Sequence, residues 1–107
     1  MKRMYVYITT NPGRTTLYVG VTNSLCRRLR EHWEKRGTNS SFAGRFRCYN
    51  LVYFEEYRRP ITAIQREKAI KGLRRRRKEN LINAVNPDWT FLPWWEWTDE
   101  TTPSFSL

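Results

Sequence analysis

Three ionisable residues, Arg28, His32 and Glu67, are expected beside or within apolar stripes, where each needs a partner. Arg28 and His32 are four residues apart and would share one face of a helix, next to its apolar stripe. An arginine at the edge of a core is costly unless it meets an anion, either a phosphate or the carboxylate of a structural ion pair. Glu67 falls inside the apolar stripe of a later helix. It needs a cation there: Arg28, Lys71 one turn later, or a metal ion.

Three tyrosines and a glycine share one face of a predicted hairpin, opposite its aliphatic face: Tyr5, Tyr7, Tyr18 and Gly20. Phenols beside a position without a side chain can form the floor of a pocket, and Gly20 would let a ligand approach the backbone. The alternative is that tyrosine is simply common in strands. Taken with an edge arginine and an inward glutamate, the group suggests phosphodiester chemistry. That reaction needs a charge clamp, a base that activates water and a metal ion on the departing oxygen.

The tyrosines depend on two strands joined as a β-hairpin. Aliphatic and aromatic residues alternate over residues 4–8 and again over residues 17–21, which predicts two half-buried strands. Residues 10–14 contain proline and glycine and should form the turn. A short apolar run over residues 51–54 is expected to be a third strand, buried on both faces.

Helices must carry the charged residues. Residues 22–24 are N-cap candidates for a helix that continues to about Lys35. Its buried stripe should be Leu25, Leu29 and Trp33. Pro60 opens a second helix, whose apolar face should be Ala63, Ile64, Ile70 and Leu73. After a break at Gly72, a basic helix should cover about residues 74–84. The expected fold is α/β: a small, mainly antiparallel three-stranded sheet flanked by helices, in the order β-β-α-β-α-α.

The composition indicates one small basic domain with a polyanionic partner. The chain has 107 residues and a net charge of +10, from 20 lysines and arginines against 10 acids. Nucleic acid is the first candidate partner and an anionic membrane surface the second. The membrane is disfavoured because no apolar run approaches the roughly 20 residues of a span. The apolar run Tyr5–Ile8 is too short for a signal peptide, so a cytoplasmic protein is expected, with Cys26 and Cys48 as reduced thiols.

The C-terminal segment is rich in both aromatic and acidic residues. Its aromatics are Trp89, Phe91, Trp94, Trp95, Trp97 and Phe105. The favoured interpretation is that the segment wraps back and adds aromatic area to a thin core. The alternative is a stacking platform for unpaired bases. The local acidic residues favour the first interpretation, because they would repel phosphates.

Several segments, in order along the chain, resemble the GIY-YIG nuclease family. Residues 5–7 (YVY) and 18–20 (YVG) are similar to the paired half-motifs of that family, although Tyr5 stands where glycine is common. Residues 22–32 resemble its first helix, with Arg28 eight positions after Gly20. Residues 64–71 resemble its metal-glutamate helix. Residues 86–89 (NPDW) resemble the closing signature of small stand-alone members, which are similar to the N-terminal nuclease domain of a repair excinuclease.

The resemblance implies a nuclease-like domain over residues 1–89, with residues 90–107 as a tail packing on it. It implies hydrolysis of phosphodiester bonds in DNA, with RNA as an open alternative and a role in DNA repair. The alternative is a non-catalytic nucleic-acid-binding module with the same fold. Neither the substrate's structure nor the oligomeric state follows from these motifs, and a monomer is the simplest assumption.

Roles for individual residues follow from the same resemblance. Tyr7 and Tyr18 would line the site, one of them orienting or deprotonating the attacking water. Arg28 would hold the scissile phosphate, His32 would support the base, and Glu67 would bind a single Mg²⁺ or Mn²⁺. The predicted contacts with nucleic acid are Gly20, Asn86 and the basic run Arg74, Arg75, Arg76, Arg77 and Lys78.

Overall fold

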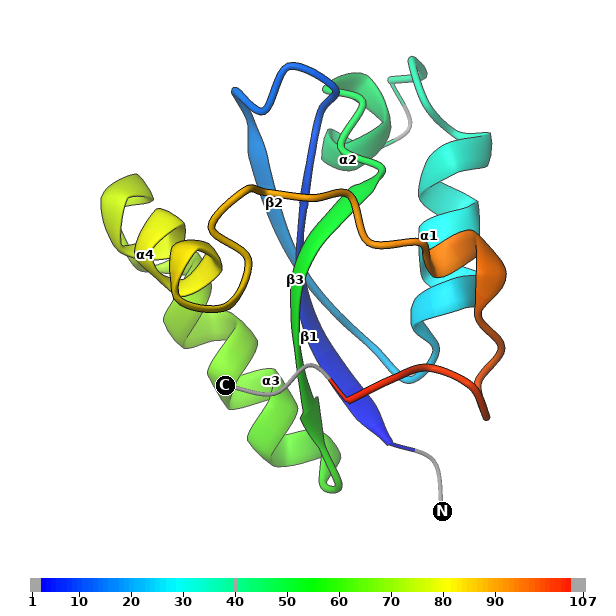
Figure 1. The fold of residues 1–107 in the computed structure, drawn as a ribbon, viewed down its shortest axis with the longest axis vertical. Helices are drawn as coiled ribbons and strands as arrows, with labels where there is room; N and C mark the ends of the chain where they lie inside the picture. Colours follow the sequence, from blue (N-terminus) through cyan, green and yellow to red (C-terminus); the bar gives the residue numbers. More distant parts are fainter. Residues whose placement is uncertain (1–2, 40, 105–107) are drawn as a thin grey trace.

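The computed structural model describes residues 3–39 and 41–104, in which a three-stranded sheet has helices on both faces (Figure 1). The strands are β1 (Met4–Thr10), β2 (Leu17–Thr22) and β3 (Asn50–Tyr57). Their spatial order is β2-β1-β3, and both pairings are antiparallel. The predicted α/β fold is confirmed. The structure adds a short helix, α2 (Phe42–Arg45), and a final 3₁₀ turn, η1 (Trp94–Glu96).

Two cores lie on opposite faces of the sheet. The aliphatic face packs on α3 (Pro60–Lys71), and the tyrosine face packs on α1 (Leu25–Glu34), as Figure 1 shows from the edge of the sheet. The aliphatic core includes Val6, Ile8, Val19, Ala63 and Ile70. The tyrosine core includes Tyr5, Tyr7, Leu25, Leu29, Phe54 and Trp94. The predicted alternation along β1 is therefore confirmed, but the tyrosine face is covered by a helix and is not an open pocket floor.

Local signals set the helix ends. Ser24 is the N-cap of α1, and its hydroxyl accepts a hydrogen bond from the backbone N–H of Arg27 at 3.3 Å. Pro60 begins α3 at the position where its missing N–H costs least, and Gly72 ends that helix. The basic helix α4 (Arg75–Val85) follows. Within the described residues, no helix is long and apolar enough to span a membrane.

The predicted apolar stripes are wrong at two positions. In α1 the third buried residue is His32, which is 3% exposed, whereas Trp33 is 41% exposed. Repeated four-residue steps drift around a helix of 3.6 residues per turn, so the stripe continues at position i+7. In α3, Ile64 is 38% exposed, whereas Ala63 and Ile70 are buried.

β3 is longer than predicted because a carboxylate at its end is fully paired. Glu55 is 8% exposed and accepts two hydrogen bonds from the guanidinium of Arg66 on α3, at 2.9 and 3.0 Å. The hydroxyls of Tyr53 and Tyr57 also donate to it. Burial raises the pKa of Glu55, but these partners outweigh burial and the pKa is lowered. The strand can therefore carry a charged residue into the interface with α3.

Part of the C-terminal segment contacts the tyrosine core. The backbone N–H of Leu92 donates to the carbonyl of Leu51 at 2.8 Å. Trp94 is buried, and the ring of Trp97 lies 5.7 Å from that of Phe54. Trp95 differs, with 56% of its surface exposed. Phe105 lies outside the described residues.

Candidate functional site

A buried tyrosine–histidine pair joins the central strand to α1. The hydroxyl of Tyr7 lies 2.9 Å from Nε2 of His32, and the two residues are 0% and 3% exposed. Tyr7 faces Gly20 across the hairpin, and a Cβ at Gly20 would overlap the phenol ring. Gly20 therefore makes room for Tyr7 and not, as predicted, for a ligand.

Tyr18, on the edge strand β2, extends this pair toward solvent. Its ring lies 5.3 Å from the His32 ring and 6.2 Å from the Tyr7 ring. On the other side it stacks with Phe42 of α2, at 6.0 Å and 24°. Tyr18 is half-buried, whereas Tyr7 has no exposed surface. Of the two predicted site tyrosines, Tyr18 is therefore the one that an external molecule can reach.

Arg28 lies beside the aromatic cluster and is already paired. Its guanidinium is 3.0 Å from the carboxylate of Glu31, and the two side chains are 34% and 42% exposed. Burial lowers the pKa of Arg28, but Glu31 and the side chains of Tyr7 and Tyr18 outweigh that effect and raise it. Arg28 is thus a permanent cation whose partner can be displaced, because an ion pair so exposed contributes little stability.

The charge state of His32 is set by its surroundings. Burial, and then the charge of Arg28, lower the pKa of His32 to about 4. Burial also raises the pKa of Tyr7 above its usual value. At neutral pH the imidazole is therefore uncharged, the phenol keeps its proton, and the two can share one hydrogen bond.

The lowered pKa of His32 makes folding stability depend on pH. The unfolded chain takes up a proton at His32 below about pH 6.5, whereas the folded protein does not until about pH 4. Protons bind more to the unfolded state in this window, so stability should fall as the pH drops through it. We expect a loss of about 2 kcal/mol between pH 7 and pH 5 in urea unfolding. His32 is the only histidine, so a His32→Gln variant should show a flatter dependence, and an equal slope would contradict the assigned pKa.

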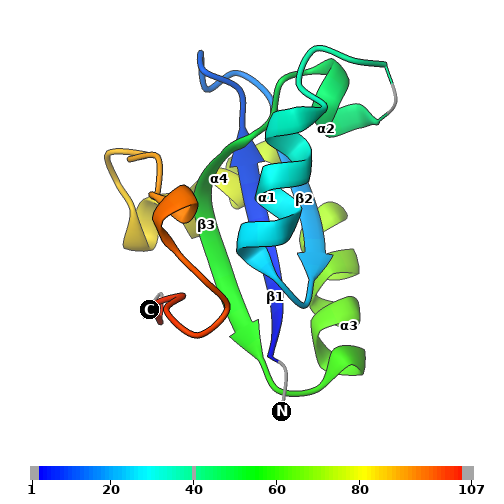
Figure 2. The same cartoon turned by 90° about the vertical axis from the view of Figure 1, so that its right-hand side faces the viewer.

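Glu67 is on α3, on the other face of the sheet from Arg28. Its side chain is 14% exposed, and its carboxylate lies 3.2 Å from the ammonium of Lys71. Lys71 is one of the three partners predicted from the sequence, beside Arg28 and a metal ion. α3 contacts β1 and β2, and Figure 2 shows it beside β2 while α1 crosses the front of the sheet. Tyr7, Tyr18, Arg28 and His32 therefore form one cluster. Glu67 belongs to α3, the helix on the opposite face of the sheet from that cluster.

Glu67 fits a metal ion as a single carboxylate ligand. Within the described residues, no group of three or more His, Cys, Asp or Glu side chains could hold a metal. Mg²⁺ is commonly held by one or two carboxylates, with water and substrate phosphates completing its shell. One largely buried carboxylate suits that mode, provided that Lys71 gives way.

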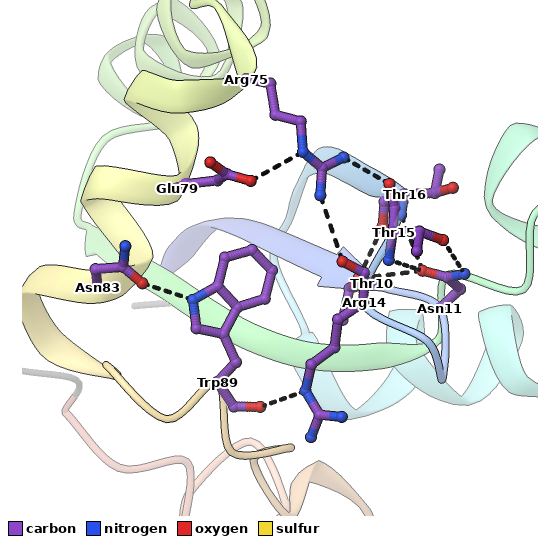
Figure 3. Close-up of polar contacts among 9 residues, drawn as sticks. All are labelled: Thr10, Asn11, Arg14, Thr15, Thr16, Arg75, Glu79, Asn83 and Trp89. Atoms are coloured by element: carbon purple, nitrogen blue, oxygen red, sulfur yellow. Dashed lines mark hydrogen bonds and ion pairs between the residues drawn. The ribbon is translucent and has the colours of Figure 1, made fainter.

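The basic run divides into a structural arginine and exposed cations. In Figure 3, Arg75 pairs with Glu79 at 2.9 Å and donates to the carbonyls of Thr15 and Arg14 in the hairpin loop. It therefore holds α4 against that loop. All four arginines, Arg74 to Arg77, are exposed, and Lys78 is half-buried.

Two further contacts in Figure 3 hold the chain after α4. The indole N–H of Trp89 donates to Asn83 at 2.6 Å, and the carbonyl of Trp89 accepts from Arg14. Asn86 is 7% exposed, and its amide donates to the carbonyls of Val52 and Thr90. Both amide hydrogens are thus used by backbone. The geometry gives Asn86 a structural role, and its contact with nucleic acid stays a prediction.

Two partners of the cluster, Glu31 and Phe42, were not predicted. Glu31 could have been identified, because an acid three residues after an arginine is a common helical ion pair. Phe42 carried no comparable signal, since its stacking on Tyr18 depends on the short helix α2.

Comparison with known proteins gives one family and two relatives. The sequence profile described as the GIY-YIG catalytic domain matches residues 3–80. A UPF0213 protein of Natronomonas pharaonis is 35% identical over 78 residues, covering 73% of this chain and 88% of the relative. A UPF0213 protein of Desulfotalea psychrophila is 38% identical over 69 residues, covering 64% and 62% of the two chains. No solved structure matches.

Proposed function

We propose that this chain, which belongs to the GIY-YIG catalytic-domain family, is a metal-dependent endonuclease that hydrolyses phosphodiester bonds in DNA. The observation that carries the proposal is the cluster of Tyr7, Tyr18, His32 and Arg28. It combines an accessible phenol, a buried neutral imidazole and a cation with a displaceable partner. These are the groups that positioning water against a phosphate requires.

Arg28 binds the scissile phosphate. A phosphate oxygen takes the place of the Glu31 carboxylate, so the guanidinium exchanges one anion for another. The fork of N–H donors suits two phosphate oxygens at once. In the transition state, negative charge grows on those oxygens, and the fixed cation stabilises it more strongly than in the ground state.

Tyr18 is the tyrosine that faces the attacking water. Tyr7 has no exposed surface, so it cannot contact water directly. It forms the hydrogen bond with His32, and this buried pair supports the ring of Tyr18 in its place. The phenol oxygen of Tyr18 accepts a hydrogen bond from the water and so orients it for in-line attack on the phosphorus.

Glu67 would hold the divalent ion, Mg²⁺ or Mn²⁺. When bound, such an ion stabilises the charge on the leaving oxygen. Lys71, with half of its side chain exposed, releases Glu67 at little cost.

The exposed cations of α4 bind the DNA backbone, and this makes a prediction. Replacing both Arg76 and Arg77 with alanine should flatten the dependence of DNA affinity on salt, by roughly 0.9 in log–log slope for each lost phosphate contact. Arg75→Ala should leave the slope nearly unchanged and lower the melting temperature, because it breaks contacts with the hairpin loop. Fluorescence anisotropy at several salt concentrations measures the slope. If Arg75→Ala flattened the salt slope and the Arg76 and Arg77 replacements did not, Arg75 would be the residue that contacts DNA.

The second candidate is a nucleic-acid-binding module without catalysis. One observation favours it: both charged site residues are neutralised within the chain, Arg28 by Glu31 and Glu67 by Lys71. Binding to DNA would need only the net charge of +10.

Cleavage assays separate the two candidates and define the substrate. Purified protein is incubated with supercoiled plasmid, labelled branched, nicked, single-stranded and plain duplex DNA, and an RNA strand, with Mg²⁺, Mn²⁺ or EDTA. The nuclease should cut at least one DNA with a divalent ion and none in EDTA. Preference for the branched or nicked form would support structure-selective cutting and a repair role. Salt-dependent binding without cutting of any substrate would establish the module.

A further inference from the structure

A cavity of about 390 Å³ lies on the flank of α1 that faces away from the catalytic cluster. Aromatic side chains make up most of its wall, which consists of Arg30, Trp33, Tyr49, Asn50, Trp94 and Trp95. The residues come from α1, the start of β3 and η1, and Figure 2 shows η1 beside α1 on the β3 side. The volume lies in the range of small-molecule sites.

We infer that this cavity binds an unpaired nucleotide of a single-stranded nucleic acid, with the base against its tryptophans and the phosphate on Arg30. The identity of this ligand rests on the proposed nucleic-acid function. The cavity itself is separate from the cleavage site.

The aromatic walls suit a flat, stacking ligand. Trp33 and Tyr49 lie 4.8 Å apart at 87°, and Trp94 and Trp95 lie 5.9 Å apart at 83°. Trp33 is 41% exposed, and the guanidinium of Arg36 lies over its ring at 3.7 Å. Trp95, at 56%, is the most exposed aromatic ring of the wall, and a stacked ligand would cover it. Every base offers a π-face, so such walls bind unpaired bases with little regard to sequence.

Two polar groups in the wall match the rest of a nucleotide. Within the described residues, no ion pair involves Arg30, which is an exposed cation on α1. The side-chain nitrogen of Asn50 is shielded from solvent and has no hydrogen-bond partner within the described residues. A buried donor without an acceptor is costly. A base carbonyl or ring nitrogen would supply the acceptor once the Asn50 side chain turns toward the cavity that it lines.

The cavity and Arg28 lie on two flanks of the same helix, so one strand can reach both. An α-helix with side chains is about 10 Å across. That distance equals about three nucleotides at the ~3.4 Å rise of a strand. A substrate held this way is unpaired a few nucleotides from the bond that is cut, as at a flap or a fork.

The test measures binding in EDTA, so it does not depend on cleavage. The probes are a fluorescent ten-nucleotide oligothymidylate and an abasic strand of equal length, followed by anisotropy. Wild type should bind the oligothymidylate more tightly than the abasic strand. Trp95→Ala should weaken oligothymidylate binding roughly 5- to 10-fold and remove that difference. Trp95→Phe should restore most of the affinity.

Arg30→Ala should weaken binding of both strands several-fold, and Arg27→Ala, another exposed arginine of α1, serves as the matched control. Circular dichroism checks that each variant folds. Wild-type affinity of Trp95→Ala, or equal binding of the two strands by wild type, would overturn the inference even if the chain cuts DNA. Loss of affinity in Trp95→Ala would support it even if the chain cuts nothing.

Discussion

An Arg28→Lys variant should fold like the wild type and cut DNA at least ~100-fold more slowly. The planar guanidinium can donate to two phosphate oxygens at once, whereas the lysine ammonium is a point charge on a longer, more flexible stem. Both side chains can pair with Glu31, so the melting temperature should change little. Initial rates on the best substrate from the cleavage assays, at saturating DNA, measure the effect on the chemical step.

Two neighbours of Arg28 serve as controls. Arg27 is exposed and donates to the side chain of Asn23, so Arg27→Lys should cut at close to the wild-type rate. Glu31→Gln removes the anion that competes with the phosphate, so it should keep cleavage and bind DNA somewhat more tightly. An inactive Arg27→Lys together with an active Arg28→Lys would show that Arg27, and not Arg28, binds the scissile phosphate.

Periodicity and turn chemistry were sufficient to predict most of the fold. The alternation over residues 4–8 and 17–21 predicted the correct strands and the correct faces. A strand shifted by one residue would place each side chain in the opposite core, so the pattern allows only one arrangement. The N-cap candidates at residues 22–24 predicted the start of α1, and the structure selects Ser24 among them. Pro60 predicted the start of α3, because a proline is tolerated in the first turn of a helix. The full length of β3 was not predictable, because Glu55 is tolerated there only through Arg66, eleven residues later.

The candidate site was predictable as a set of residues and not as an arrangement. The resemblance to a family supplied Tyr7, Tyr18, Arg28 and His32, and the structure brings these four together. Their partners depend on tertiary contacts that a sequence pattern does not contain. From the sequence, a glycine at position 20 predicts open space for a ligand. The sequence does not show that the Tyr7 ring fills that space.

The basic run illustrates the same limit. Five consecutive cations on a helix point in most directions, and composition cannot tell which of them face the protein. The structure bonds Arg75 to the hairpin loop through two backbone carbonyls, although Arg75 is itself exposed, as are Arg76 and Arg77. Whether these cations bind DNA remains a prediction, and the salt slope measures it.

A Glu67→Gln variant should lose divalent-ion-dependent cleavage by at least ~100-fold, because the amide keeps the size of the side chain but loses the charge that would hold the ion. Stability should change by less than about 0.5 kcal/mol, since half of the Lys71 side chain is exposed and water can replace its partner. DNA affinity in EDTA should stay the same or rise slightly, because one negative charge has been removed. Plasmid cleavage with a Mg²⁺ or Mn²⁺ titration measures the loss, and thermal unfolding measures stability.

Glu56→Gln is the matched control for this prediction, because Glu56 is also a partly buried carboxylate paired with one exposed cation, Arg3. It should cut like the wild type. Mn²⁺ binding followed by electron paramagnetic resonance in the presence of a DNA that is not cut gives a readout separate from activity. Wild type and Glu56→Gln should bind the ion, whereas Glu67→Gln should bind it at least tenfold more weakly. A folded Glu67→Gln protein that cuts DNA and binds Mn²⁺ as the wild type does would show that Glu67 serves only as the partner of Lys71.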